Sequence, residues 1–207
     1  MTEPHRALNT MATPSPSLTS IKALFFDVFG TVVDWRSTVT RSLHHSATTA
    51  LSASSIYHTI PSPVRSKASS LQLSDWADFA AAWRATYYAF TRSVATSANP
   101  GAPYKTVDEH HYDSLLDLLK EWDLQGLWSA DEVKEMSLVW HRLDPWSDSC
   151  EGIRKLNRRF TTCTLSNGNV GLLKDMAKYA GLEWTEVLSS EMFKRYCVQY
   201  KNAAVGC

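Results

Sequence analysis

The sequence predicts an α/β protein, with a Rossmann-like parallel sheet core, incomplete at about three strands, and an inserted helical cap. Three observations lead to this fold class. A short apolar strand lies near the N-terminus, a long middle stretch has helical periodicity without a strand signal, and strands and helices alternate after it. Such alternation is typical of parallel sheets, so we expect the middle stretch to be an insertion between two halves of one core. The length of 207 residues suits a core plus a small cap.

The first predicted strand is residues 21–26, a short apolar run that is bounded by polar sequence. It ends at Asp27, and Phe29, Gly30 and Thr31 follow as a turn. Ligands of open parallel sheets bind at the carboxyl ends of the strands. Asp27 is therefore well placed for chemistry.

The middle of the chain, about residues 36–145, is predicted to form the helical cap. Its first part, 36–70, is rich in Ser and Thr, and Pro61 and Pro63 mark a loop there. From Leu71 onward, apolar residues recur at three- and four-residue steps, which is the spacing of one helix face. The residues of this stripe are Trp76, Phe79, Trp83, Tyr87, Phe90 and Val94.

Two capping boxes of the Ser/Thr-x-x-Glu type open further helices in the cap. One helix is expected from 106 to about 122, and the other from 129 to near 141. Asn-Pro-Gly at 99–101 ends the helix before them. The residue before a proline is biased out of the helical region, so Asp144-Pro145 marks the end of the cap.

Strands and helices alternate again after the cap, which assigns the core to residues 21–35 plus 146–196. A turn, Ser166-Asn167-Gly168, follows the second strand, and Gly181 ends the helix after it. The expected elements are a helix at 151–159, a strand at 160–165, a helix at 169–179 and a strand at 186–188.

Charge and cysteine content argue against several classes of function. Lys+Arg and Asp+Glu both number 21, so the zero net charge gives no general attraction to nucleic acid or to anionic membranes. No apolar run is long enough to span a membrane. The cysteines form no C-x-x-C pair, so we expect no zinc site, thiols in a reducing compartment and a cytoplasmic location. They are Cys150, Cys163, Cys197 and Cys207.

Residues 1–20 are rich in Ser, Thr and Pro and lack the apolar run of a secretory signal. We interpret them as a disordered leader. A role in organelle targeting is the alternative.

The two loops at the strand ends carry groups suited to covalent catalysis. Asp27 can act as a nucleophile when donors orient it, and Thr31 supplies a hydroxyl four residues on. Ser166 and Asn167 add a hydroxyl and an amide beside a helix N-terminus, which favours an anion pocket. The sequence therefore predicts a site for a small anionic substrate between the two strand ends.

Each of these residues also has a structural alternative. Asp27 could cap a turn, Ser166-Asn167 could be an ordinary turn, and Arg84 could be a solvated charge on a helix. The aromatic stripe is typical of packing, and Asp34 of a helix cap. Two pairs of adjacent histidines are present, His44-His45 and His110-His111. Adjacent residues do not share a helix face, so we interpret these histidines as surface residues and not as metal ligands.

Two motifs stand at the ends of the first two predicted strands: residues 26–34 read Phe-Asp-Val-Phe-Gly-Thr-Val-Val-Asp, and residues 164–168 read Thr-Leu-Ser-Asn-Gly. They resemble the first and second motifs of the haloacid dehalogenase-like superfamily. Residues 140–146 and the pair Trp83-Arg84 are similar to the type II 2-haloacid dehalogenases. The resemblance covers about residues 21–196.

This resemblance implies a hydrolytic dehalogenase that acts on short 2-halo carboxylic acids. Phosphatases of the superfamily usually carry a second Asp two residues after the nucleophile, as the general acid, whereas this chain has Phe29 there. A halide leaves without a proton, so an aromatic residue fits dehalogenation. One carboxylate fewer also favours a site without a metal or another cofactor.

In the implied mechanism, Asp27 attacks carbon 2 of the substrate, expels halide and forms an ester that water then hydrolyses. Thr31 orients Asp27, and Phe29 supplies an apolar wall. Arg84 pairs with the substrate carboxylate or the halide, and Ser166 and Asn167 hold the same groups. Two alternatives stay open: a magnesium-dependent phosphatase of the same superfamily, and a non-catalytic fragment.

The resemblance stops after Tyr196, where the family continues with Lys-Pro and a further segment. That segment supplies a lysine for the nucleophile, a later loop and the last strands of the sheet. Residues 197–207 form an atypical tail, so we expect a truncated chain of doubtful activity, with Lys201 a poor substitute for the missing lysine. Without the last strands, the first strand becomes an open edge, which favours aggregation or a homodimer.

Overall fold

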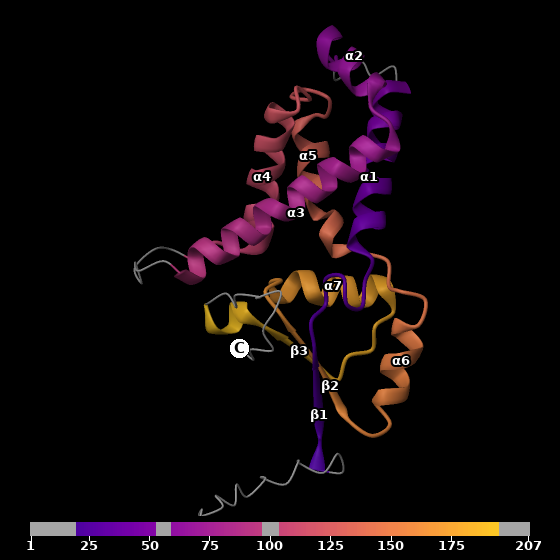
Figure 1. Cartoon of the computed structure of the whole chain (residues 1–207), viewed down its shortest axis with the longest axis vertical. Coiled ribbons are helices and arrows are strands. Elements are labelled where there is room, and N and C mark those ends of the chain that lie inside the picture. The colour runs from indigo at the N-terminus through magenta and orange to yellow at the C-terminus, as the bar shows by residue number, and fades with distance from the viewer. Residues whose placement is uncertain (1–19, 53–58, 97–103, 195–207) are drawn as a thin grey trace, which may run out of the picture.

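The computed structural model describes residues 20–52, 59–96 and 104–194. Figure 1 shows two parts, a set of helices and, below it, a small sheet with helices of its own. We call α1–α5 with η2 the helical part, and β1–β3 with α6 and α7 the sheet part. Most of the predicted leader, the Asn-Pro-Gly break at 99–101 and the tail at 197–207 with Lys201 lie outside the described residues.

The described sheet consists of three parallel strands in the order β1-β2-β3. Their bounds are Ala23–Phe26 for β1, Thr161–Ser166 for β2 and Glu186–Ser189 for β3. β2 is central, and in the described part of the chain β1 pairs only with β2. The side chain of Phe25 on β1 is 57% exposed, so this face of the strand is not covered by the described residues. This arrangement confirms the predicted α/β fold with a parallel sheet.

Two helices belong to the sheet part, α6 (Ser149–Leu156) and α7 (Val170–Ala180). α7 contacts β3 on one side and the helical part on the other, so it lies between the strands and the helices above them (Figure 1). Gly181 follows α7 in the left-handed conformation, with φ of +71°, and its N–H donates to the carbonyl of Ala177. The predicted stop at Gly181 is therefore confirmed.

The helical part contains α3 (Leu73–Thr96), α4 (Val107–Glu121), α5 (Ala130–Ser137) and the 3₁₀ helix η2 (Leu138–His141). Both predicted capping boxes are present at the starts of α4 and α5. A further 3₁₀ helix, η3 (Ser190–Phe193), follows β3. Local capping signals therefore place these helix starts correctly.

The loop expected around Pro61 and Pro63 is wrong in part, because the segment 36–70 folds mostly into α1 (Trp35–Ser52) and α2 (Ser62–Ser70). Pro61 caps α2 and Pro63 lies in its first turn, where a missing N–H breaks no helical hydrogen bond. α1 is polar overall, but it buries an apolar row at four-residue steps. Asp34 caps it, since its Oδ1 accepts the N–H of Ser37 at 3.1 Å, and the buried row is Val39, Leu43 and Ala47.

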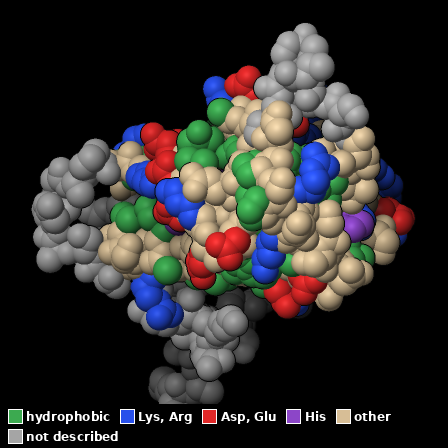
Figure 2. All heavy atoms as spheres, turned by 90° about the horizontal axis from the view of Figure 1, so that it is seen from above, with side chains coloured by type: hydrophobic (Ala, Val, Ile, Leu, Met, Phe, Trp, Pro, Cys, Tyr) green, Lys and Arg blue, Asp and Glu red, His purple; other side chains and the backbone are tan. Residues whose placement is uncertain are grey.

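Most large buried side chains lie in the helical part. Trp76, Phe79 and Trp83 of α3 are almost fully buried, which confirms that the centre of the aromatic stripe packs into a core. On the face seen in Figure 2, acidic and basic side chains are interspersed. No helix in the described residues is long and apolar enough to cross a bilayer.

Candidate active site at the strand ends

The turn after β1 brings the hydroxyl of Thr31 back to the carboxylate of Asp27. Thr31 Oγ1 donates to Asp27 Oδ2 at 2.9 Å, and the backbone N–H groups of Thr31 and Val32 both donate to the carbonyl of Val28. Gly30 has φ of +91°, which a residue with a side chain adopts only with strain. The sequence therefore folds this turn locally, and the hydroxyl fixes one oxygen of a half-buried carboxylate.

Phe29 joins the two strand-end loops. Its side chain is only 6% exposed, and its ring lies against Gly168 of the loop after β2. A Cβ at Gly168 would come within 3.2 Å of the Phe29 ring, so the loop can approach only because the residue is glycine. The ring also contacts Trp140, with ring centres 6.5 Å apart. Phe29 is thus an apolar wall at the point where the two predicted motifs meet.

The loop after β2 differs in one respect from the predicted anion pocket. Ser166 Oγ accepts the N–H of Gly168 at 3.2 Å, so this hydroxyl is used within the loop. Glu191 Oε2 accepts the N–H of Val170 at 2.7 Å and so occupies the N-terminus of α7. One N–H group of the expected anion pocket is therefore already bound by a carboxylate from η3, which the positive end of the α7 dipole favours. No local sequence signal connects residues 170 and 191.

Arg84 is buried, not solvated. It is 3% exposed, and its guanidinium carbon lies 4.2 Å from the ring centre of Tyr87 and 4.7 Å from that of Tyr88. It also lies 5.0 Å from the ring centre of Phe29, which places it at the wall between the two loops. Nε and Nη1 have no hydrogen-bond partner among the described residues. Buried charges are normally paired, so this guanidinium is arranged to meet an anion.

Tyr87 links the buried arginine to the second loop. It is 4% exposed and shares a side-chain hydrogen bond with Asn167, which is itself buried. Burial raises the pKa of the Tyr87 phenol, Arg84 and the bond to Asn167 lower it, and the Asp27 carboxylate raises it. All four residues therefore interact electrostatically in one site. Sequence reasoning placed Tyr87 only in the packing stripe.

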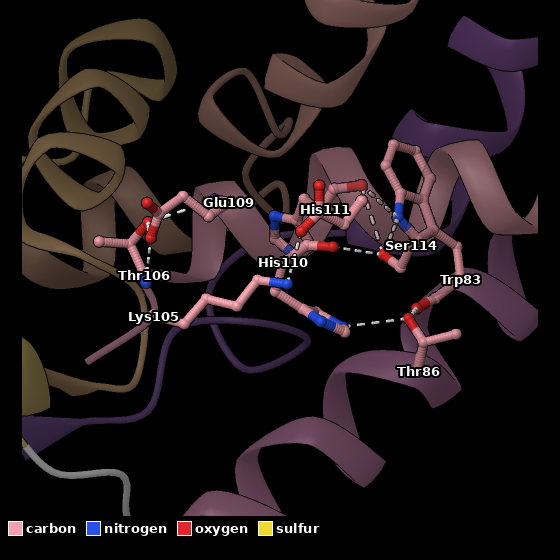
Figure 3. A network of polar contacts seen from close by, with 9 residues as sticks. Trp83, Thr86, Lys105, Thr106, Glu109, His110, His111 and Ser114 are labelled. Atoms are coloured by element: carbon pink, nitrogen blue, oxygen red, sulfur yellow. Dashed lines mark hydrogen bonds and ion pairs between the residues drawn. The ribbon is translucent and has the colours of Figure 1, made fainter. Parts of the chain in front are cut away.

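The interpretation of His110 and His111 as surface residues is wrong. His111 is completely buried and stacks on Trp140, with ring centres 4.6 Å apart, and neither ring nitrogen has a hydrogen-bond partner among the described residues. His110 stacks on Phe90 and shares a hydrogen bond with Thr86 Oγ1 at 3.2 Å (Figure 3). Adjacent residues both become buried here because α4 packs against α3 on one side and η2 on the other.

Burial keeps the rings of His110 and His111 neutral at neutral pH. Burial lowers the pKa of His110 to about 4, with a further decrease from Lys105. Burial lowers the pKa of His111 well below its ordinary value, and electrostatic interactions with His110, Arg84 and His141 lower it further. Trp83 and Ser114 tie the same layer together, since Trp83 Nε1 donates to Ser114 Oγ at 3.1 Å (Figure 3). Neither His110 nor His111 therefore carries a positive charge that would compete with Arg84 for an anion.

A polar clasp connects the helical part to the sheet part. The ring of His141 bonds Asp108 of α4 through Nε2 at 3.1 Å and Asp175 of α7 through Nδ1 at 2.9 Å. Asn169, at the start of α7, donates to the other oxygen of Asp108 at 2.6 Å. Burial lowers the pKa of His141, but the hydrogen bonds and charges of the two carboxylates outweigh it and raise the pKa overall. The clasp therefore ties α4 and η2 of the helical part to α7 of the sheet part.

No three His, Cys, Asp or Glu side chains gather in a metal-binding arrangement within residues 20–52, 59–96 and 104–194. A surface hollow of about 460 Å³ borders Arg41, Arg142 and Tyr179 and does not include Asp27, Arg84 or Asn167. The metal-free, cofactor-free site stays a prediction, as do the roles assigned to Asp27, Phe29, Thr31, Arg84, Ser166 and Asn167.

No family model matches the sequence, and a search of curated proteins finds no match. Solved structures do match. The L-2-haloacid dehalogenase PA0810 is 29% identical over 85% of this chain, with a TM-score of 0.65. The defluorinating L-2-haloacid dehalogenase Rha0230 is 29% identical over 89% of this chain, with a TM-score of 0.70. An L-2-haloacid dehalogenase from Xanthobacter autotrophicus with chloropropionic acid covalently bound is 18% identical over 85% of this chain, with a TM-score of 0.63, and supports the fold alone.

This chain spans 65% of the length of PA0810, 67% of Rha0230 and 59% of the Xanthobacter enzyme. Fold, motifs and neighbours agree, and the chain is similar to the L-2-haloacid dehalogenases and fits the type II family of the haloacid dehalogenase-like superfamily.

Proposed function

We propose that this protein is a hydrolytic dehalogenase of short L-2-halo carboxylic acids. The observation that carries the proposal is the buried guanidinium of Arg84, which has two nitrogens without partners among the described residues and lies over the ring of Phe29. A guanidinium in an aromatic surrounding suits a small carboxylate or a halide. The two neighbours at 29% identity, both L-2-haloacid dehalogenases, support the same substrate class.

In the proposed reaction, Asp27 attacks carbon 2 of the substrate with one carboxylate oxygen, and the carbon–halogen electrons leave with the halide. The bond from Thr31 Oγ1 to Oδ2 holds the carboxylate in one orientation during this step. Water then attacks the acyl carbon of the aspartyl ester and releases the 2-hydroxy acid. Because only the first step occurs at carbon 2, the product has inverted configuration.

The aromatic wall favours halide departure over phosphate transfer. Phe29 occupies the position at which a phosphatase of the superfamily usually carries its general acid, and its buried ring offers no oxygen to a proton or a metal. Desolvation by this wall makes a carboxylate nucleophile more reactive toward a carbon–halogen bond. A magnesium-dependent phosphatase is therefore the less favoured activity.

We also propose the wider organisation that the sequence suggests. Residues 21–35 plus 146–196 form the catalytic core, and residues 36–145 form a cap that carries Arg84. We further propose a cytoplasmic location, in which the described cysteines, Cys150 and Cys163, stay free thiols. In the described residues β1 pairs only with β2, which supports pairing of its other edge with a second copy of the chain. Size measurement in solution tests the last proposal.

Halide release from L-2-chloropropionate by the purified chain tests the proposed function. We expect wild-type protein to release chloride and Asp27→Ala to release none. In a single turnover in water with heavy oxygen, the label should enter Asp27 and not the lactate product, since water attacks the acyl carbon.

Asp34→Ala is the matched control, because Asp34 is a carboxylate of the same segment that caps α1 and bonds Ser37. It should cost about 1 kcal/mol of stability and leave halide release detectable. A folded wild-type chain that releases no halide would refute the proposal for this chain, and magnesium-dependent release of phosphate from a generic ester would replace it with the phosphatase.

A further inference from the structure

Tyr87 contacts both halves of the proposed site. It lies on α3, one helical turn after Arg84, and its ring is the nearest of the aromatic rings around that guanidinium, at 4.2 Å. Its phenol shares a hydrogen bond with Asn167, in the loop after β2. The same side chain therefore connects the cation of the helical part to the amide of the sheet part.

The position of the ring restricts Arg84. Residues three apart on a helix face the same side, so Tyr87 stacks on a guanidinium from its own helix. With Tyr88 at 4.7 Å and Phe29 at 5.0 Å, the ring leaves the guanidinium little freedom to turn away from the strand ends. A desolvated cation–π contact is among the stronger contacts of this kind, so it favours one orientation of the guanidinium.

The phenol of Tyr87 holds the side chain of Asn167 through a hydrogen bond. Tyr87 is 4% exposed and Asn167 5% exposed, so water does not readily replace their hydrogen bond. Burial raises the pKa of the phenol, and it stays protonated at neutral pH. The amide of Asn167 is therefore held by a partner that belongs to the helical part.

We propose that Tyr87 is a positioning residue, which fixes the Asn167 amide and the Arg84 guanidinium relative to each other so that both meet the same anion. The proposal rests on the proposed function for its substrate, a short 2-halo acid. It predicts that the phenol hydroxyl acts through Asn167 and that the ring acts through Arg84.

Tyr87→Phe isolates the hydroxyl, because the ring over Arg84 stays in place. We expect kcat/KM for L-2-chloropropionate to fall about tenfold, which is the effect of one buried hydrogen bond. In the Asn167→Ala background the same substitution should change kcat/KM less than about twofold, since the partner is already absent. Tyr87→Leu should lower kcat/KM further than Tyr87→Phe, because the ring over Arg84 is lost as well.

Tyr179→Phe is the matched control. Tyr179 Oη donates to Asp144 Oδ1 at 3.1 Å on the exposed side of α7, so this variant also loses one phenol hydrogen bond. It should keep kcat/KM within about twofold of wild type. Its thermal midpoint gives the change in stability expected from a lost phenol bond alone.

Binding of propionate, followed by tryptophan fluorescence, separates this proposal from the proposed function. If the wild-type chain binds propionate but releases no halide, a weaker affinity in Tyr87→Phe still supports the positioning role. Equal kcat/KM in wild type and Tyr87→Phe overturns the role while the dehalogenase stands. Equal losses from Tyr87→Phe with and without Asn167 also overturn it, as does a wild-type chain that neither binds propionate nor releases halide.

Discussion

Replacement of Arg84 by methionine should make the protein more stable and abolish anion binding. The side chain is 3% exposed, and its Nε and Nη1 have no hydrogen-bond partner among the described residues. Five aromatic rings lie within 6 Å of the guanidinium carbon, the nearest being that of Tyr87 at 4.2 Å. Methionine fills a similar volume, has no unsatisfied donor and packs well on aromatic rings.

The magnitude follows from two opposing contributions. Each buried donor group without a partner costs about 1–3 kcal/mol, so two nitrogens cost about 2–6 kcal/mol. Cation–π contacts with the two nearest rings, Tyr87 and Tyr88, return about 2–4 kcal/mol when desolvated. The net cost of the arginine in the empty site is about 1 kcal/mol, and Arg84→Met should raise the thermal midpoint by about 2–4 °C.

Chemical and thermal unfolding, each with and without propionate, measure both halves of this prediction. Propionate at about one hundred times its dissociation constant should stabilise the wild-type protein by about 2.7 kcal/mol. Arg84→Met should gain nothing from propionate. Arg142→Met is the control, because Arg142 is an exposed arginine paired with Glu135 at 2.7 Å and should change stability by less than about 0.5 kcal/mol.

A loss of more than about 2 kcal/mol in Arg84→Met would show that the guanidinium stabilises the fold, so that our view of an anion receptor is mistaken. Stabilisation of that variant by propionate would show that the anion binds elsewhere. Either result would remove the main support for the proposed substrate class.

Gly168→Ala should destabilise the protein by about 1–3 kcal/mol and impair halide release, because its Cβ would meet Phe29 and Leu173 at 3.2 Å. Gly171→Ala, with nothing within 4 Å of the added atom, should stabilise α7 by about 0.5–1 kcal/mol in the same unfolding assay. The low pKa of His110, about 4, means that the unfolded chain binds more protons below pH 6.5. The free energy of unfolding should therefore decrease as the pH falls from 6.5 to about 4. His110 contributes at most about 3 kcal/mol to this decrease, and less once solvent screening is included. An equally steep decrease in His110→Leu would contradict this prediction. The raised pKa of His141 has the opposite sign, so its contribution is present below pH 6.5 and is lost as the pH rises through its folded-state pKa. The difference in stability between wild type and His141→Gln should shrink over that interval, and a constant difference would exclude the charge as its cause.

The sequence predicts best where the signal is local. The strand that ends at Asp27, the turn through Gly30 and the bond from Thr31 to Asp27 all lie within a few residues. The capping boxes of α4 and α5 are equally local, since one side chain and one N–H three residues apart decide them. Such features depend little on the rest of the fold, which is why one sequence suffices to find them.

The sequence predicts poorly where distant segments decide. α1 is polar, and its apolar row is too short to indicate a helix from the sequence alone. The row is Val39, Leu43 and Ala47, and it is buried in the fold, where α1 packs against α3. His111 is buried because α4 lies between α3 and η2, which no pattern within α4 reveals. Glu191 reaches the N-terminus of α7 from beyond the next strand. In the sequence, Tyr87 cannot be distinguished from the packing residues of its helix, because its hydrogen bond to Asn167 joins segments far apart in the chain.

The site divides its charges between the two parts of the molecule. The sheet part supplies the carboxylate of Asp27, and the helical part supplies the guanidinium of Arg84 from beyond an aromatic wall. Attack by an anion on an anionic substrate requires both charges, because the cation must offset the repulsion between nucleophile and substrate carboxylate. In the proposed reaction, the rate therefore depends on how the two parts are held together, and we expect the clasp at His141 and the bond of Tyr87 to Asn167 to influence it. A variant that loosens either contact should lose activity before it loses its fold.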